Sequence, residues 1–531
     1  MSARLGQRIT TGVALCALAV FVGSAWPVQA KEKPVRGKAK HVVLVVWDGM
    51  RPDFVNETNA PTLWKLAREG VNFRNHHSVY PTLTSVNATA LATGVHPSRS
   101  GPIANYEYRP EIDRAKLARM DAPSTIRKGD EGSGGKYLAV PTIAELVQSG
   151  GGRTAVAGTK PAPILFDRKA APLSKVSQRS ITLFEGAALP DSARAMIEKL
   201  LGPYPARSEL PSVADDAWTT RALTEGLWKD GVPDFSVLWM GEPDRSLHAA
   251  APGSEKALAA IKSSDANLAV LLRALEQKRV RDQTDIMVVS DHGFSTIGRS
   301  IHVAGVLSKD GFTVAGNSDT TLGQGVIRVA GNGGTNLFYV SEHDAEATAR
   351  LVEWLQQSDF AGVIFSRVPL EGTFPLSTVY LETAAGPDVV MSFRWIDRRN
   401  EHDVPGMIDA NGKGDGARGT HGTLSRFDVH NILVAVGPDF RRDFSTDLPS
   451  SNMDIAPTIA HILGITPPHP LDGRILSEAL VNGDTAPATA EAETVEASRP
   501  VKGGTWRQYL RVSKVGATVY IDEGNGAFSP E

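Results

Sequence analysis

Acidic residues follow three apolar runs of this sequence, at the positions where buried strands are expected to end. Asp48 follows VVLVVW, Glu242 and Asp244 follow FSVLWM, and Asp291 follows DIMVVS. Open parallel sheets bind ligands beyond the carboxyl ends of their strands, so these acids lie where a reaction could be carried out. Taken singly, an aspartate in this position is more often a turn or helix-cap residue.

Histidines accompany these acids at informative spacings. His248 follows Asp244 by four residues, which puts both side chains on one side of a helical turn, and His292 follows Asp291 directly. His421 lies in GTHG, where the flanking glycines let the backbone approach an ion closely. Imidazole and carboxylate groups from four separated segments predict two metal ions, with Zn²⁺ the best match and Mn²⁺ or Fe as alternatives.

Two neighbouring metal ions stabilise the attacking and leaving oxygens of an in-line displacement at phosphorus, so this ligand set indicates phosphoryl chemistry. The segment YPTLTSVNATALATG supplies hydroxyl groups just before a helical stretch. Thr84 could present its hydroxyl to a metal ion and to the positive end of that helix, which favours an anionic substrate. On local sequence alone, it is equally consistent that Thr82 or Thr84 is only an N-cap.

Alternating strand and helix patterns predict how these residues are positioned. From His41, apolar runs alternate with helical segments such as PTLWKLAREG, which is typical of an α/β fold with a mostly parallel sheet and helices on both faces. Strands are predicted at 153–158, 234–240 and 285–290, and a long helix at 255–278. Further on, NILVAVG predicts a strand and MDIAPTIAHILG a helix.

The chain of 531 residues exceeds the roughly 250 to 300 residues of a single core, so additional parts are expected. Gly-rich turns, Val-rich strands and the amphipathic segment AEATARLVEWLQQ predict a smaller α+β lobe at 303–418, inserted into a core formed by 38–302 and 419–482. For 483–531 we expect a mobile linker, TAPATAEAETVEASRP, and a short C-terminal hairpin.

The first thirty residues have the pattern of a secretory signal peptide. Arg4 and Arg8 precede an apolar run, and Ala30 closes the segment. The run at 12–26 is shorter than the roughly 20 residues of a membrane span, so export with cleavage, to the periplasm or the medium, is favoured over an anchor. Cleavage would remove Cys16, the one cysteine, and leave neither disulfides nor thiolate ligands.

The charge balance disfavours a role in binding nucleic-acid polymers. The formal net charge is −3, from 56 basic and 59 acidic side chains, and no long cationic face is evident. A small substrate is therefore the expected partner. The sequence carries no expectation for the oligomeric state.

Five segments together resemble the nucleotide pyrophosphatase/phosphodiesterase branch of the alkaline phosphatase superfamily. They are VVWDGMRPD, YPTLTSVNATALATGVHPSRSGPIANYEY, EPDRSLH, SDHGF and GTHG, in the order and at roughly the intervals of that branch. DIAPTIAHILGI followed by LDGRIL also looks like the closing helix of the superfamily. The resemblance implies an alkaline-phosphatase-like core over roughly residues 40 to 300 and 415 to 480, and it covers neither the inserted lobe nor the tail.

Carried over by residue, the resemblance implies two ion sites. One ion would be held by Asp244, His248 and His421, and the other by Asp48, Asp291, His292 and Thr84. Thr84 is implied to be the nucleophile that becomes transiently phosphorylated. Asn105 and the backbone amide after Thr84 are implied to bind a nonbridging phosphoryl oxygen, as in an oxyanion hole.

Three positions depart from the family pattern. Ser85 stands where nucleotide-cleaving relatives usually carry an aromatic residue, so a nucleotide preference does not follow, and Leu247 replaces a common glycine. Lys160 lies near the place where phosphomonoesterases and phosphonoacetate hydrolases of the superfamily use a lysine, but Ala162 occupies their second basic position. The alternative for Lys160 is a solvated loop lysine.

The leading hypothesis is hydrolysis of phosphodiester or pyrophosphate bonds in small exported substrates, through a phosphothreonine on Thr84 and two Zn²⁺ ions. The alternative is a phosphomonoesterase or phosphonoacetate-type hydrolase that uses Lys160. A sulfatase is disfavoured because Thr84 lacks the Cys/Ser-x-Pro/Ala-x-Arg context. A noncatalytic, metal-stabilised binding protein is a less favoured third hypothesis, since fold does not imply function.

Overall fold

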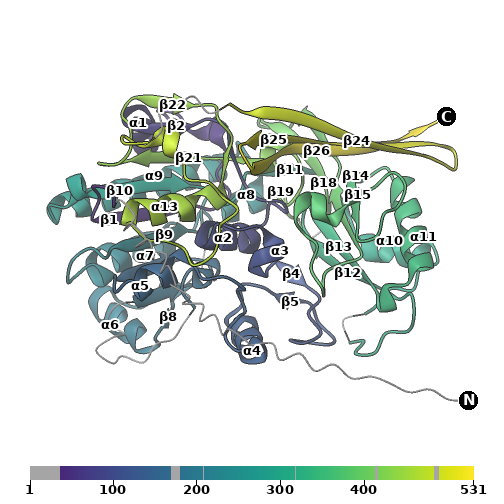
Figure 1. Ribbon diagram of the computed structural model, residues 1–531, viewed down its shortest axis with the longest axis horizontal. Coiled ribbons are helices and arrows are strands. Elements are labelled where there is room, and N and C mark those ends of the chain that lie inside the picture. Colours follow the sequence, from purple (N-terminus) through teal and green to yellow (C-terminus); the bar gives the residue numbers. More distant parts are fainter. Residues whose placement is uncertain (1–35, 169–179, 207–208, 317, 413–415, 484–488) are drawn as a thin grey trace, which may run out of the picture.

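The computed structural model describes residues 36–168, 180–206, 209–316, 318–412, 416–483 and 489–531 (Figure 1). The expected signal peptide, 1–30, lies outside the described residues. Within those residues, every helix is too short or too polar to cross a membrane.

A nine-stranded sheet forms the centre of the molecule, with the strand order β22-β2-β21-β10-β1-β9-β6-β7-β8. The strands are β1 (His41–Trp47), β2 (Val71–Phe73), β6 (Thr154–Gly158), β7 (Ser180–Phe184), β8 (Ala187–Leu189), β9 (Phe235–Met240), β10 (Thr284–Val289), β21 (Leu433–Val436) and β22 (Phe444–Thr446). Neighbours from β10 to β7 run parallel, while β21 and β8 are antiparallel to their partners. The predicted, mostly parallel α/β sheet is therefore confirmed.

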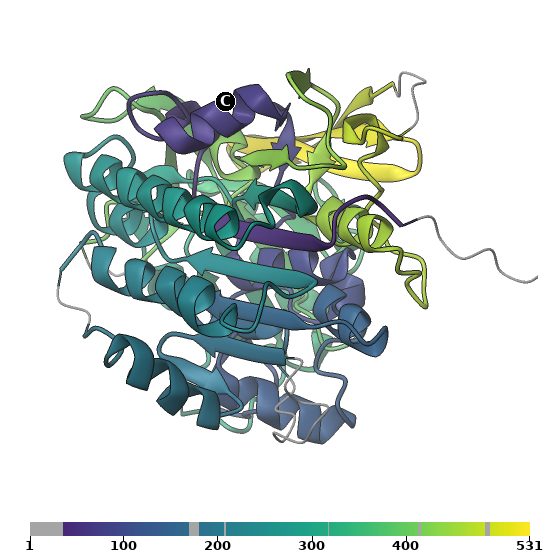
Figure 2. The ribbon, with the colours of Figure 1, turned by 90° about the vertical axis from the view of Figure 1, so that its left-hand side faces the viewer.

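Strand β1, purple in Figure 2, lies in the middle of this sheet, and its residues after His41 are buried. Val42, Leu44 and Val46 belong to one apolar core, and the alternate residues of the strand belong to the other. The first core contains α2 (Thr84–Thr93), α5 (Ile143–Ser149) and α13 (Ile455–Leu463). The second contains α1 (Pro61–Glu69), α6 (Ser192–Leu201), α7 (Val213–Arg221) and α9 (Glu255–Gln277). Helices on both faces explain why β1 is apolar at every position after His41.

The segment predicted as an inserted lobe contains a five-stranded sheet of its own, with the order β12-β13-β16-β14-β15. Its elements are β12 (Ile327–Asn332), β13 (Thr335–Val340), β14 (Ala361–Ser366), β15 (Phe374–Pro375), β16 (Val389–Phe393), α10 (Val303–Lys309) and α11 (Ala345–Gln356). One face packs on the two helices, and the other, through Leu337 and Val390, on Val86 and Ala90 of α2. The lobe thus shares an apolar cluster with the helix that begins at Thr84.

A second small sheet, β17-β18-β11-β19, joins the lobe to the core. Its strands are β11 (Ser295–Ile301), β17 (Trp395–Arg399), β18 (Pro405–Asn411) and β19 (Gly419–Thr420). Strand β11 pairs with β18 on one side and with β19 on the other. This sheet therefore connects the end of the lobe to the loop that carries His421.

The C-terminal region differs from the sequence prediction. We expected a linker and a short hairpin, but β24 (Glu491–Val501), β25 (Gly504–Val515) and β26 (Thr518–Pro530) form a three-stranded sheet, seen in yellow along the green lobe in Figure 1. The linker prediction is wrong for 491–500, because this segment pairs with β25 along its whole length, and its first residues, 485–488, lie outside the described residues. Hydrogen bonds between strands compensate for its small number of large apolar side chains.

Candidate metal centre and active site

The three predicted aspartates meet at one edge of the central sheet. Strands β10, β1 and β9 are neighbours, and their carboxyl ends carry Asp291, Asp48 and Asp244 respectively. Asp244 is the first residue of α8 (Asp244–Ala250), which places His248 one turn later, as the spacing predicted. Parallel strand order alone therefore brings these three acids together.

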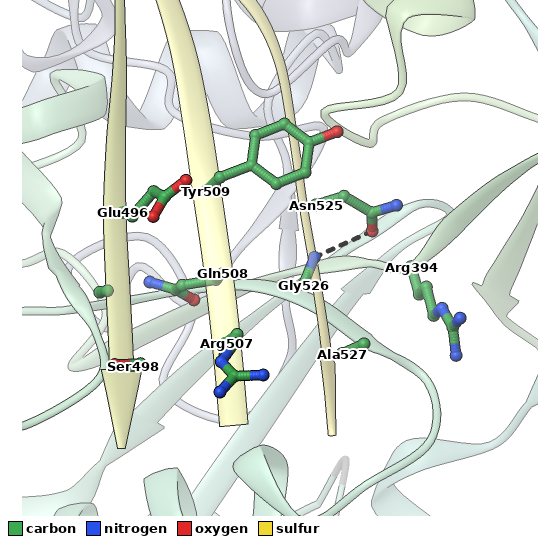
Figure 3. Close-up of a pocket in the computed structure, with 10 residues that line it drawn as sticks. Arg394, Glu496, Ser498, Arg507, Gln508, Tyr509, Asn525, Gly526 and Ala527 are labelled. Carbon is green, nitrogen blue, oxygen red and sulfur yellow. Dashed lines mark hydrogen bonds between the residues drawn. The ribbon is translucent and has the colours of Figure 1, made fainter. Parts of the chain in front are cut away.

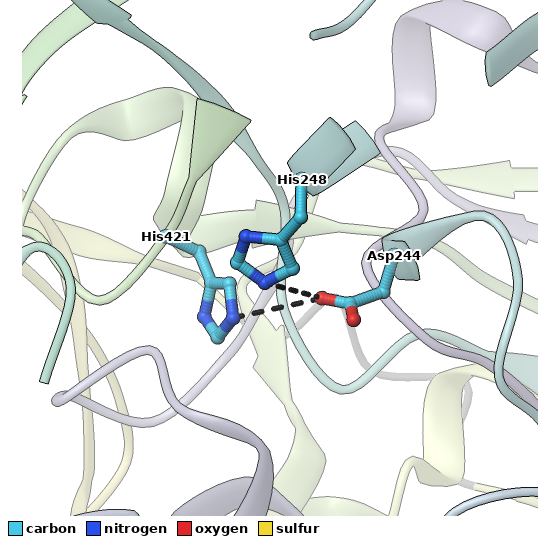
Figure 4. Close-up of side chains that lie close together, drawn as sticks. All are labelled: Asp244, His248 and His421. Carbon is cyan, nitrogen blue, oxygen red and sulfur yellow. Dashed lines mark ion pairs between the residues drawn. The ribbon is translucent and has the colours of Figure 1, made fainter. Parts of the chain in front are cut away.

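Two groups of possible ligands result. Asp244, His248 and His421 form one group (Figure 4), and Asp48, Asp291 and His292 form the other; within each group the ligand atoms lie within 4.8 Å of one another. The groups adjoin, because the rings of His292 and His421 stack with centroids 3.5 Å apart.

The three histidines are held in one tautomer by backbone carbonyl groups. The Nδ1 atoms of His248, His292 and His421 lie 2.9, 2.9 and 2.7 Å from the carbonyl oxygens of Gly419, Gly293 and Thr82. A carbonyl only accepts, so each Nδ1 must carry the hydrogen. Each Nε2 faces a carboxylate of its group, at 3.2 to 3.6 Å. This is how proteins orient histidines that ligate metals.

In each aspartate, likewise, one carboxylate oxygen is held by a hydrogen bond and the other faces the metal-binding position. Asp48 Oδ2 accepts from the Trp239 indole at 2.8 Å, and Asp291 Oδ1 accepts from the Gly49 amide at 3.1 Å. By contrast, Asp244 Oδ1 and Asp291 Oδ2 are buried and accept no hydrogen bond from the described residues, and Asp48 Oδ1 lies beside one cation, the Lys160 ammonium group at 2.8 Å. Buried acceptors without donors are unfavourable unless a cation neutralises them. The donor set therefore fits two divalent ions.

The electrostatics indicate a site with excess negative charge. Burial, followed by repulsion from Asp291, raises the pKa of Asp48 well above its ordinary value. Burial lowers the pKa of His292, but Asp291 and Asp48 outweigh it and raise the pKa to about 9. Burial and the neighbouring His292 lower the pKa of His421, which keeps that imidazole neutral as a ligand. Crowded carboxylates of this kind are stabilised by bound cations.

Thr84 is the first residue of α2, and its hydroxyl lies 3.2 Å from Nε2 of His292. The N-cap of this helix is Leu83, which has no capping side chain, so the interpretation of Thr84 as an N-cap is wrong. Thr82 is not the cap either: its hydroxyl donates to the carbonyl of Thr423 at 3.0 Å. Thr84 thus combines a helix N-terminus with the edge of a ligand group, as a nucleophile requires.

Asn105 contacts the same turn of helix. Its Oδ1 accepts a hydrogen bond from the backbone amide of Ser85 at 2.8 Å. The resemblance implied that this amide binds substrate, but in the structure it donates to Asn105 instead. The side-chain Nδ2 of Asn105 is the donor group of this pair that the Ser85–Asn105 hydrogen bond does not use.

Lys160 lies inside the site and is not a solvated loop residue. Its side chain is 15% exposed, and its Nζ lies 2.8 Å from Asp48 Oδ1 and 2.5 Å from Asp244 Oδ2. One ammonium group therefore contacts both ligand groups. Burial lowers the pKa of Lys160, but Asp244 and Asp48 more than offset this and raise it above its ordinary value, so the amine is charged.

Glu242, the fourth acid at a strand end, is absent from both ligand groups. Its carboxylate accepts from the backbone amides of Ser212 at 2.7 Å and Ser246 at 3.0 Å. The neighbouring Asp216 of α7 accepts from Thr159 Oγ1 at 2.6 Å and from the Gly241 amide at 2.9 Å. Through these hydrogen bonds, Glu242 and Asp216 hold the loops that carry Lys160 and Asp244.

Sequence reasoning missed three residues that support the site: Trp239, Asp216 and Asn452. Asn452 Nδ2 donates to the backbone carbonyl of Asp291 at 2.7 Å. A tryptophan inside a buried strand signals that its N–H needs a partner, which could have pointed to Trp239. Asp216 and Asn452 lie in segments without a local signal.

The inserted lobe supports the loop that carries His421. The amide of Gly334, in the turn between β12 and β13, donates to the carbonyl of His421 at 2.8 Å. Gly422 has φ +112°, and a Cβ there would lie 2.9 Å from the Asn332 carbonyl. The glycine of GTHG is thus needed for close contact with the lobe as well as for its backbone conformation.

A separate pocket of about 410 Å³ lies on the C-terminal sheet (Figure 3). Its lining includes Arg394, Glu496, Arg507, Tyr509 and Asn525, and none of the predicted site residues. The two ligand groups at the edge of the central sheet are therefore distinct from this pocket.

The sequence matches the family described as Type I phosphodiesterase / nucleotide pyrophosphatase over residues 42–382. Human ectonucleotide pyrophosphatase/phosphodiesterase family member 5 is 23% identical over 80% of this chain and 74% of its own length. Human family member 7 is 26% identical over 55% of each chain. Venom phosphodiesterase 2 of Crotalus adamanteus is 24% identical over 50% of this chain and 28% of its own. The chain thus matches between about a quarter and three quarters of these relatives.

The fold is shared with solved structures. Murine ectonucleotide pyrophosphatase/phosphodiesterase 5 superposes with a TM-score of 0.59 at 18% identity, covering 83% of this chain and all of that one. This likeness confirms the expected alkaline-phosphatase-like fold. Because the family match spans well over half of its residues, the chain belongs to the Type I phosphodiesterase / nucleotide pyrophosphatase family of the alkaline phosphatase superfamily.

Proposed function

We propose that this protein hydrolyses phosphodiester or pyrophosphate bonds of small substrates, with Thr84 as nucleophile and two divalent metal ions, Zn²⁺ by ligand chemistry, as cofactors. The main observation that supports this proposal is that the two groups of possible metal ligands lie next to each other, beside one hydroxyl group at a helix N-terminus. Solved relatives support the substrate class, since an inactive variant of the murine protein is in complex with AMP.

The residues of the site would have different roles in the reaction. Asp244, His248 and His421 would hold one ion, and Asp48, Asp291 and His292 the other, beside Thr84. When bound, the two ions supply charge that lowers the pKa of the threonine hydroxyl and stabilises the attacking and leaving oxygens. The Thr84 oxygen attacks phosphorus, the bond to the leaving alcohol or phosphate breaks, and water then hydrolyses the phosphothreonine and restores the hydroxyl.

Asn105 would stabilise the transition state. With its Oδ1 fixed on the Ser85 amide, its Nδ2 can donate to a nonbridging oxygen beside Thr84. A donor fixed in advance stabilises charge that develops during the reaction. Asn105 is therefore proposed as the oxyanion-binding residue.

Steady-state rates with bis-p-nitrophenyl phosphate and p-nitrophenyl phosphate test the proposal, using protein loaded with two equivalents of zinc. A diesterase should prefer the first substrate. When the reaction is quenched, Thr84 should carry a p-nitrophenyl phosphoryl group from the diester or a phosphate group from the monoester, as mass spectrometry would detect. A protein that is inert toward both esters would favour the noncatalytic binding protein.

One observation keeps the phosphomonoesterase or phosphonoacetate-type hydrolase as a second candidate. Lys160 Nζ lies within the site, where it could bind a dianionic phosphate or a carboxylate. Replacing Lys160 with alanine should then reduce monoester hydrolysis far more than diester hydrolysis. An equal effect on both substrates would reject this role.

We also propose that the protein is exported, to the periplasm or the medium. The support is the pattern of residues 1–30, with two arginines, an apolar run and a small closing residue. N-terminal sequencing of the mature protein would test it, with cleavage after Ala30 as the expected result.

A further inference from the structure

We propose that the pocket on the C-terminal sheet is a second binding site, which takes a sugar that carries a phosphate or carboxylate group. Its volume of about 410 Å³ lies within the range of small-molecule sites in proteins. Residues of β24, β25 and β26 line it together with Arg394, and none of the six candidate metal ligands contributes. The site is therefore separate from the proposed reaction centre.

Two arginines of this pocket have no partner among the described residues. Figure 3 shows Arg507 on the middle strand of the sheet and Arg394 beyond β26. Neither side chain makes a hydrogen bond or an ion pair within the described part of the chain. Arg511, two positions further on the same face of β25, differs because its guanidinium lies 2.9 Å from Glu523 Oε1. A guanidinium presents a planar fork of donors that matches phosphate and carboxylate groups, so the two unpaired arginines favour an anion.

The strand register leaves space beside Arg507. Its direct neighbours across the sheet are Ser498 of β24 and Ala527 of β26, which are small and uncharged. Glu496 is the only acid among the residues that are described as lining the pocket, and it lies two positions along β24, opposite Tyr509. The lining is therefore positive at the Arg507 end, where an anionic group has room to bind.

Both arginines extend from backbone that the structure holds in place. Arg507 is followed by Gln508, whose Oε1 accepts from the amide of Ile364 at 2.8 Å and whose Nε2 donates to the carbonyl of the same residue at 3.2 Å. These two bonds fix the middle strand on the lobe. The amide of Arg394 donates to the carbonyl of Phe360 at 2.8 Å. Because the backbone is already ordered, less conformational freedom is lost when a ligand binds.

The other end of the pocket fits the remainder of a sugar. Tyr509 lies there beside Glu496, and its hydroxyl donates to Glu523 Oε1 at 3.1 Å, which orients the ring. The ring offers a flat apolar surface, and the Glu496 carboxylate accepts hydrogen bonds from hydroxyl groups. Ser498 adds a hydroxyl that both donates and accepts. A ligand with one anionic group, several hydroxyls and a flat apolar face meets these requirements, as a sugar phosphate or a uronic acid does.

Calorimetric titrations of the zinc-loaded full chain test the inference, with glucose 6-phosphate, glucuronate and glucose as probes. The Thr84→Ala background prevents turnover of the phosphate ester. At least one acidic sugar should bind about tenfold more tightly than glucose, and the tighter of the two identifies the anion. Equal Kd values for all three sugars, or a Kd above about 10 mM for both acidic sugars, would overturn the inference.

Variants of the two arginines locate the binding site. Arg507→Ala and Arg394→Ala should each weaken binding of the acidic sugar about tenfold and change the Kd of glucose less than about twofold. Arg398 of β17 supplies a matched control, because it is exposed and lies outside the lining, so Arg398→Ala should keep the original Kd. Unchanged affinity in both Arg507→Ala and Arg394→Ala would overturn the inference, as would an equal loss in Arg398→Ala.

A last comparison separates this site from the metal centre. With Thr84 intact, Arg507→Ala should hydrolyse bis-p-nitrophenyl phosphate at the wild-type rate, because Arg507 lies outside both ligand groups. If Lys160→Ala abolished binding of the acidic sugar and Arg507→Ala did not, the sugar would bind at the metal centre and the inference would be overturned. The proposed diesterase function would stand in that case.

Discussion

Two clusters of three histidines lie in the core of this protein, and they differ in what their ring nitrogens meet. In the ligand cluster, formed by His248, His292 and His421, each Nδ1 is bonded to a carbonyl, and each Nε2 faces a carboxylate oxygen that accepts no hydrogen bond from the described residues. The second cluster consists of His76, His77 and His430 and is held between β3 (His76–His77), β20 (His430–Asn431) and β23 (Ser450–Ser451).

In the second cluster, the ring nitrogens of His76 and His77 lie beside groups of the protein. His76 bonds Ser450 Oγ at 2.9 Å and Asn452 Oδ1 at 3.1 Å, so both of its nitrogens have partners. His77 Nδ1 donates to the carbonyl of Ser450 at 2.9 Å, and its Nε2 lies 3.0 Å from Asp522 of β26. The comparison teaches that burial and residue type do not distinguish a metal site from a structural cluster. What distinguishes the ligand cluster is that its imidazoles converge with three carboxylates, whereas among the described residues one carboxylate, that of Asp522, meets the second cluster.

The largest effect is expected at the hydroxyl beside the ligand cluster. Thr84→Ala should reduce turnover on the order of 10⁴-fold, because a covalent nucleophile is removed while all six ligands stay. Metal content by mass spectrometry should remain at two ions per chain. Ser85→Ala, one residue along the same helix, is the control and should retain most activity; unchanged rates in Thr84→Ala would reject the mechanism.

Metal content should distinguish variants of the ligand cluster from variants of the second cluster. His421→Ala removes a ligand and should lower turnover on the order of 10³-fold, with loss of about one ion per chain. His76→Ala should keep both ions, because its nitrogens are bonded to protein groups. Loss of metal from both variants to the same extent would remove the distinction between the clusters.

Substitutions in the second cluster should affect stability more than catalysis. His77→Gln removes the partner of Asp522, whose side chain is 21% exposed, and should reduce the free energy of unfolding by about 2 to 3 kcal/mol. Urea unfolding of metal-free protein measures this change. Asp522→Asn should cost less, because an amide leaves no buried carboxylate. A His77→Gln protein as stable as wild type would show that the contact does not anchor the C-terminal sheet.

The second cluster should also give the stability a pH dependence. Burial lowers the pKa of His76 and of His430 to about 3, so both are neutral in the folded protein but protonated when unfolded below about pH 6.5. The free energy of unfolding is therefore unaffected by these groups above about pH 6.5. As the pH falls from there toward 3, each group lowers it by about 1.4 kcal/mol per pH unit. Unfolding of metal-free protein at pH 6.0 and 5.0 should show this slope. His430→Gln should reduce this slope by the contribution of one titrating group, about 1.4 kcal/mol per pH unit. An unchanged slope in that variant would contradict the lowered pKa of His430.

Much of the fold and of the candidate site was predictable, because the signals are local. Apolar runs of the right length predicted β1, β9 and β10, and parallel order places the acids that follow them at one edge. The spacing of Asp244 and His248 follows from one helical turn. These relations need no knowledge of distant contacts.

The missed features depend on contacts between distant segments. Strand β24 looks like a linker because its pairing with β25 is not encoded in its own composition. Asn452 supports Asp291 across 161 residues of sequence, and Trp239 reaches Asp48 across 191. The bond between the Ser85 amide and Asn105 likewise depends on a chain path that periodicity does not define.

Anomalous diffraction at the zinc edge, from crystals grown with two equivalents of zinc, tests the central claim most directly. Two peaks are predicted, one between Asp244, His248 and His421 and the other between Asp48, Asp291 and His292. They should lie about 4 Å apart, as in two-metal phosphoryl-transfer sites. Zinc at the second histidine cluster, or no zinc at these six side chains, would contradict the proposed two-metal site.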